Sequence, residues 1–86
     1  MQEYKVKENQ LICKYLSEIV NDLSRDKKKS ILAYESDIPR SVVLYIMEGK
    51  KDPQLTTFFR LARGLGKMPS EIMKLLEDKL NNKWDF

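Results

Sequence analysis

Apolar residues recur at steps of three and four along almost the whole chain, and this spacing limits the possible folds more than any other feature. Such steps place apolar side chains on one face of an α-helix. No alternating run in the sequence is bounded by the Asn-Gly or Asp-Gly turns that are typical of β-hairpins. The 86 residues therefore predict one small all-α domain.

Helix start and stop signals divide the chain into five predicted helices, over residues 8–23, 27–36, 39–48, 54–63 and 68–81. Asp26 is the predicted N-cap of the second helix, and Pro39 is predicted at the first position of the third. Gly49 is predicted to cap the end of the third helix, whereas Gly64 and Gly66 are predicted to end the fourth.

Turns of only a few residues separate these helices, which predicts that they pack as one compact five-helix bundle. The single domain covers residues 1–86, with its core at about 8–81. We expect a frayed N-terminus at residues 1–7 and a C-terminal tail at residues 82–86 that ends in two aromatic residues.

The chain lacks the residues on which most catalytic and metal sites depend. It has no histidine, one cysteine and no glycine-rich phosphate loop. We therefore expect a protein that is not an enzyme and that binds no metal and no cofactor. Cys13 is interpreted as a half-buried structural thiol. The charged start does not resemble a signal peptide, and no apolar stretch predicts a membrane span, so a cytoplasmic location is expected.

Positive charge is concentrated in the middle of the chain. Between Ser24 and Lys67 there are ten basic and five acidic residues, although the net charge of the whole chain is only +3. A basic middle is typical of a chain that binds a polyanion such as nucleic acid. A solvated, lysine-rich surface is the alternative explanation of the same pattern.

The second and third predicted helices have the residue spacing of a helix-turn-helix. That motif needs a buried apolar residue and a small one on its first helix, a turn residue that tolerates left-handed geometry, and apolar residues that plug the junction and face the core. These positions are filled, in chain order, by Leu32, Ala33, Asp37, Ile38, Val43 and Ile46.

The segment after the third predicted helix strengthens this interpretation. Its EGKKDPQLTTFFRLARGLGKMPSEI sequence resembles the corresponding segment of the lambda repressor and Cro-like helix-turn-helix family, the XRE family. The pieces that carry the resemblance are Gly49-Lys50, Pro53, Leu61-Ala62, Leu65-Gly66 and Pro69-Ser70-Glu71. It covers about residues 29–73, half of the chain.

The resemblance implies sequence-specific binding of double-stranded DNA by a repressor-like regulator of transcription. In that family the start of the third helix reads base edges in the major groove. Carried onto this sequence, the base-reading residues are Arg40, Ser41, Val42 and Tyr45. The residues implied to contact phosphates are Lys29, at the start of the second helix, and Lys50 and Lys51, after the third.

Two further partners remain open at this stage. The apolar side chains of Val42, Leu44 and Met47 would also suit a protein-interaction module or an antitoxin that docks on a partner protein. A homodimer is expected, because two-fold dimers are the usual arrangement for this motif. Its predicted interface is the fifth helix and tail, namely Ile72, Leu76, Leu80, Trp84 and Phe86; alternatively, these residues cover the chain's own first helix.

Overall fold

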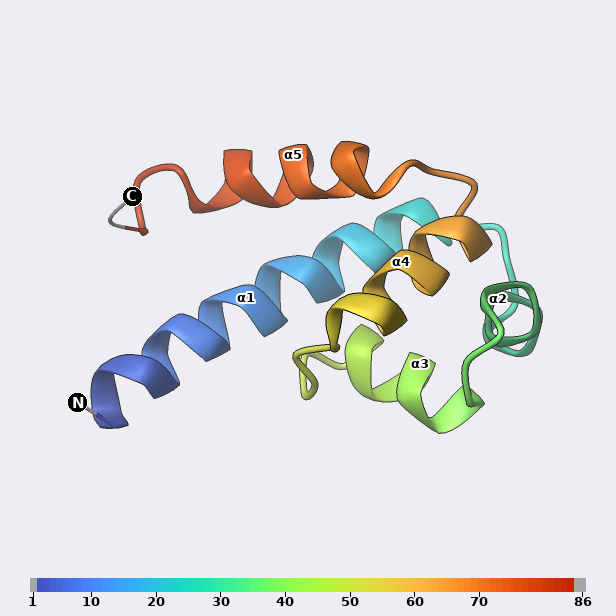
Figure 1. Cartoon of the computed structure of the whole chain (residues 1–86), viewed down its shortest axis with the longest axis horizontal. Helices are drawn as coiled ribbons and strands as arrows, with labels where there is room; N and C mark the ends of the chain where they lie inside the picture. Colours follow the sequence, from blue (N-terminus) through green and yellow to red (C-terminus); the bar gives the residue numbers. More distant parts are fainter. Residues whose placement is uncertain (1, 85–86) are drawn as a thin grey trace.

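The computed structural model of the chain describes the backbone of residues 2–84 and the side chains of residues 7–84. Within residues 2–84 the chain forms five α-helices and no strand, as expected for an all-α domain. They are α1 (Gln2–Leu23), α2 (Lys29–Ser36), α3 (Arg40–Met47), α4 (Leu55–Gly64) and α5 (Pro69–Leu80). Figure 1 shows α1 running through the middle of the molecule, with α5 along one side of it and α2, α3 and α4 gathered on the other.

The predicted starts of α3, α4 and α5 were each one residue too early, and two predicted helix starts were wrong by more. The first helix begins at Gln2 and not at residue 8, because residues 2–7 include neither proline nor glycine to stop it. The second begins at Lys29 and not at residue 27, and its N-cap position is Lys28, whose side chain makes no capping hydrogen bond. Asp26 is therefore not the N-cap.

A contact between distant segments explains the late start of α2. The Nζ atom of Lys27 donates a hydrogen bond to the carbonyl oxygen of Gly64, at 2.9 Å, and also forms an ion pair with Glu35. Lys27 thus satisfies a carbonyl at the C-terminus of α4, where a positive charge is favourable. This contact places Lys27 in the connection between α1 and α2, outside the helix.

The core forms where α1 packs against the other helices. Its buried residues include Leu16, Ile19 and Val20 of α1, and Phe58, Leu61 and Ala62 of α4. The residues that the helix-turn-helix spacing predicted to be apolar scaffold are all buried: Leu32, Ala33, Ile38, Val43 and Ile46. The sequence pattern therefore located the inward faces of α2 and α3 correctly.

Asp37 adopts the left-handed conformation that its position in the turn predicted, with φ 58° and ψ 46°. Two backbone hydrogen bonds close the turn, each 3.2 Å long. The N–H of Asp37 donates to the carbonyl oxygen of Tyr34, and the N–H of Ile38 donates to that of Ala33. This is the pairing by which many helices end, usually with glycine at the left-handed residue. Asp37 therefore directs the chain from α2 into α3 at some conformational cost.

Replacing Asp37 with glycine is expected to raise the free energy of unfolding by about 0.5–1 kcal/mol, because relief of left-handed strain outweighs the added freedom of the unfolded chain. Urea unfolding followed by circular dichroism would measure the change. Gly66→Asp is the matched control. Gly66 has φ +70°, and apart from its chain neighbours no atom lies within 4 Å of an added Cβ. This substitution should therefore lower stability only by placing a non-glycine residue in the left-handed conformation. A loss of stability in Asp37→Gly would contradict the strain argument.

Candidate nucleic-acid interface

The candidate interface is built on α3, which buries one face and exposes another. Val43 and Ile46 are almost completely buried, so the helix cannot rotate without exposing them. Pro39 was predicted at the first position of this helix but is instead its N-cap residue, and the helix begins at Arg40. As the first N–H groups of an α-helix lack partners within it, those of Arg40 and Ser41 are directed beyond the helix start.

The other end of α3 is attached to α1. The side-chain amide of Asn21 donates one hydrogen bond to the carbonyl oxygen of Met47, at 2.9 Å, and one to that of Ser17, at 2.7 Å. Gly49 follows with φ +74°, in the left-handed region, and lies against α1 near Cys13 and Ser17. The predicted helix-ending role of Gly49 is thereby confirmed, and α3 is held at both ends by the rest of the domain.

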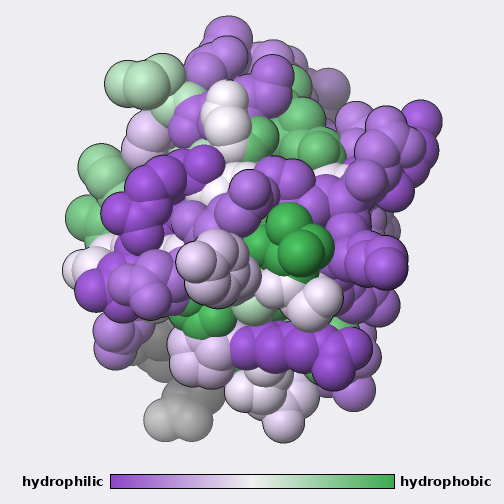
Figure 2. Space-filling view, turned by 90° about the vertical axis from the view of Figure 1, so that its right-hand side faces the viewer, coloured by the Kyte–Doolittle hydropathy of each residue, from purple (hydrophilic) through white to green (hydrophobic). Residues whose placement is uncertain are grey.

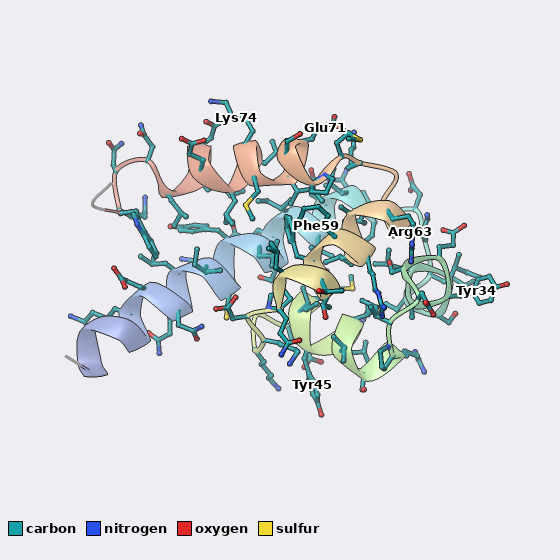
Figure 3. The ribbon with its side chains drawn as sticks, viewed as in Figure 1. Tyr34, Tyr45, Phe59, Arg63, Glu71 and Lys74 are labelled. Carbon is teal, nitrogen blue, oxygen red and sulfur yellow. The ribbon has the colours of Figure 1, made fainter. Side chains whose placement is uncertain are left out.

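Three of the four predicted base-reading residues are exposed on α3. Arg40 and Ser41 lie in its first turn, and Tyr45 follows one turn later with 51% of its surface accessible. Figure 3 shows Tyr45 extending from α3 away from the other helices. Val42 differs from these residues, because it is half-buried and packs against the core. The structure therefore brings Arg40, Ser41 and Tyr45 to the surface of one helix and leaves Val42 less accessible.

The predicted phosphate-contacting lysines lie at the start of α2 and directly after the end of α3. Lys29 is exposed and is the first residue of α2. Lys50 is exposed after the end of α3, and its Nζ atom lies 3.4 Å from a carboxylate oxygen of Glu48. Since both side chains of this pair are largely in solvent, the pair holds Lys50 only weakly. Lys51 is half-buried.

Three basic residues of the middle segment have structural contacts instead. Lys27 binds the Gly64 carbonyl, as described above. Arg60 donates to the carbonyl oxygen of Asp37 at 3.5 Å, and Arg63 donates to that of Ser36 at 3.3 Å. Both arginines thus bind carbonyls at the C-terminus of α2, where cations stabilise a helix. Some of the basic residues in the middle of the chain therefore connect α2 and its preceding loop to α4. The count of charges alone did not predict this structural role.

Sequence reasoning missed one prominent side chain beside this surface. Tyr34 is 85% exposed on α2, next to the turn that leads into α3. Figure 3 shows it extending outward from α2. The face of the molecule that carries α2 is mainly hydrophilic, with hydrophobic side chains in a few small patches (Figure 2). The exposure of Tyr34 could have been predicted from the sequence, because the residue after the buried Leu32-Ala33 pair falls on the outward face of a helix.

The predicted dimer residues of α5 lie inside the chain's own core. Ile72, Leu76 and Leu80 are buried, and Trp84 is half-buried and packs against the same core. Because α5 packs on α1, the alternative that these residues cover the first helix accounts for their burial. Phe86 lies outside the described residues. Self-association stays a prediction, and any interface on α5 has to use other side chains.

Cys13 is buried more deeply than the half-buried thiol that was predicted. Burial, and to a smaller extent the negative charge of Asp52, raise the pKa of the Cys13 thiol. The thiol is therefore protonated at neutral pH and packs as a small apolar group. Within the described part of the chain, no three histidine, cysteine, aspartate or glutamate residues gather as metal ligands.

Comparison with known proteins adds no further assignment. A scan against protein-family models, a search of curated proteins and a search of solved structures each found no match. Among residues 2–84, none of the helices is both long enough and apolar enough to cross a membrane. The functional interpretation therefore rests on the residues of α2 and α3 and on the sequence resemblance over about residues 29–73.

Proposed function

We propose that the chain is a helix-turn-helix protein that binds double-stranded DNA with α3 in the major groove and acts as a repressor-like regulator of transcription. The observation that carries this proposal is the division of α3 into two faces. Val43 and Ile46 are buried, while Arg40, Ser41 and Tyr45 are exposed on the same short helix. The major groove of B-DNA is about 12 Å wide and admits an α-helix with such an exposed face.

Each exposed residue suits a different contact. The guanidinium of Arg40 can donate two hydrogen bonds to the O6 and N7 atoms of guanine, the commonest specific contact in this groove. Ser41 and Tyr45 carry hydroxyl groups that can donate to or accept from base edges or phosphates. Lys29 and Lys50 would bind the phosphate backbone, which gives affinity and register without reading sequence.

Replacing Arg40 with alanine is expected to weaken binding to a site selected from random duplex DNA by about 10- to 100-fold and to relax the preference at one base pair. Lys50→Ala should weaken binding to selected and random DNA alike and should lower the salt dependence by about one ion. Fluorescence-anisotropy titrations at two salt concentrations would separate these effects.

Lys74→Ala is the matched control for Lys50→Ala. Lys74 is exposed on α5, on the side of the molecule away from α3 (Figure 3), so its removal should leave both affinity and preference unchanged. Equal affinity of the unaltered chain, Arg40→Ala and Lys50→Ala for all duplexes would refute groove reading by α3. Binding that does not weaken as salt increases would also refute it.

The alternative, a protein-interaction module or antitoxin that docks through an apolar α3, receives less support. Val42 and Met47 pack against the core, and Leu44 is half-buried, so the accessible apolar surface of α3 is smaller than the sequence indicated. The exposed residues of this helix are mainly polar. This difference favours DNA over an apolar protein surface as the partner of α3.

A further inference from the structure

Exposed apolar side chains gather on a different part of the molecule, where α4 faces α5. Leu55 and Phe59 lie one turn apart on α4 and are 65% and 53% exposed, and Met73 of α5 is 44% exposed. Leu55 and Met73 line one shallow groove together with the partly or fully buried Ile12 and Phe58. We call Leu55, Phe59 and Met73 the α4–α5 patch. Apolar groups clustered in this way usually mark a binding surface.

Phe59 is held in place as the central aromatic group of this patch. Its ring lies edge-on against the buried ring of Phe58, with the centroids 6.3 Å apart and the planes at 71°. A ring fixed by such a contact loses little freedom when a partner covers it. Figure 3 shows Phe59 on the side of α4 that faces α5, whereas Tyr45 extends from the far side of α3. The patch and the DNA-facing side of α3 are therefore separate surfaces.

The two ends of the α4–α5 patch carry opposite charges. Asp52 precedes α4, and its carboxylate accepts a hydrogen bond from Asn9 at 3.0 Å but stays exposed. Arg63 follows Phe59 by one turn at the other end and stays exposed although it donates to the Ser36 carbonyl. Figure 1 shows that α4 and α5 run in opposite directions, so the later turns of α5 lie toward the start of α4.

We infer that the α4–α5 patch is the docking surface for a second copy of this chain, in a two-fold symmetric dimer. A two-fold interface brings the same patch of both chains together, so the patch has to be complementary to itself. Antiparallel contact of two α4 helices places Phe59 against the partner's apolar side chains. It also places Asp52 of each chain near Arg63 of the other. An apolar centre with opposite charges at its ends meets that requirement.

Phe59→Asp is expected to weaken self-association by at least about 30-fold, the effect of removing a central aromatic anchor. Sedimentation velocity over a concentration series would show the unaltered chain approaching twice its 10.2 kDa mass and the variant remaining at that mass. Leu75→Asp is the matched control, because Leu75 is exposed on α5 but lines a different hollow, with Leu23 and Lys67. It should associate as the unaltered chain does.

A charge exchange tests the geometry independently of Phe59. Asp52→Arg and Arg63→Asp should each weaken association through like-charge contacts, whereas the double variant should restore it. Each substitution also removes a hydrogen bond within the chain, to Asn9 or Ser36, so circular dichroism has to show unchanged helix content in all three variants. A monomer mass for the unaltered chain up to about 1 mM would overturn the proposal, as would equal effects of Phe59→Asp and Leu75→Asp. These measurements contain no DNA, so their outcome does not depend on the proposed function.

Discussion

Replacing Gly64 with alanine is expected to lower the free energy of unfolding by about 3 kcal/mol, near the upper end of the usual cost of overpacking. An added Cβ at Gly64 would lie 1.9 Å from the Oγ atom of Ser36, 2.9 Å from its Cβ atom and 3.0 Å from its backbone nitrogen. Rotation of the Ser36 side chain cannot relieve the last two contacts. The helices α2 and α4 would have to separate.

Helix propensity and packing against α2 predict opposite effects of Gly64→Ala on stability. Gly64 is the last residue of α4, and alanine is normally preferred to glycine in a helix by about 1 kcal/mol. Urea unfolding would therefore show a gain in stability if propensity decided the outcome and a loss if the close approach to α2 decides it. Increased stability of Gly64→Ala would contradict the packing described for this crossing.

A double substitution isolates the contact itself. Ser36→Gly removes the two side-chain atoms that lie nearest the new Cβ, whereas the backbone nitrogen, at 3.0 Å, remains. Gly64→Ala should then cost less in the Ser36→Gly background than alone, by about 1 kcal/mol or more. Equal costs in both backgrounds would show that the loss arises elsewhere than in contact with Ser36.

Replacing Leu61 with alanine is expected to remove about 2–5 kcal/mol of stability, because the lost contacts leave a cavity that the neighbouring helices fill only partly. Leu61 has no accessible surface and belongs to the central cluster of the core. A chain of 86 residues has roughly 4–13 kcal/mol of stability in total. This single change therefore removes a large share of it, and thermal unfolding would show a much lower midpoint.

Leu75→Ala makes the same chemical change at a position that is 41% exposed on α5. Its cost should stay below about 1 kcal/mol, because a partly solvated side chain leaves no closed cavity. Both variants are compared at one low protein concentration, so that self-association does not add to the stability of either. A similar loss in the two variants would mean that Leu61 is not packed as described.

Helical periodicity was sufficient to predict most of the fold. The five helices, the buried faces of α2 and α3, and the left-handed turn at Asp37 follow from local spacing and local backbone chemistry. These features depend on residues close together in the chain, for which sequence rules work well. Asp26 shows their limit: a good capping residue is not used, because Lys27 is drawn to the carbonyl of Gly64, 37 residues away.

The same limit applies to the candidate sites. Periodicity identified Ile72, Leu76 and Leu80 as one apolar face of α5, but it could not show that α1 covers that face. Val42 and Met47 flank the buried face of α3, and their exposure depends on how closely the neighbouring helices approach. Sequence therefore predicted Arg40, Ser41 and Tyr45 as exposed candidates better than it predicted any surface made by two helices.

The position of α1 also has a consequence for the order of folding. α2 packs on α3, and α4 packs on α5, so these contacts join neighbours in the chain; α2 also packs on α4, with Lys27 bonded to Gly64 across 37 residues. α1 instead reaches across long loops, through Asn21 to Met47, Asn9 to Asp52 and Glu18 to Lys79, which are 26, 43 and 61 residues apart. Since longer loops cost more entropy to close, we expect the docking of α5 on α1, which closes the longest of these loops, to be a late step in folding.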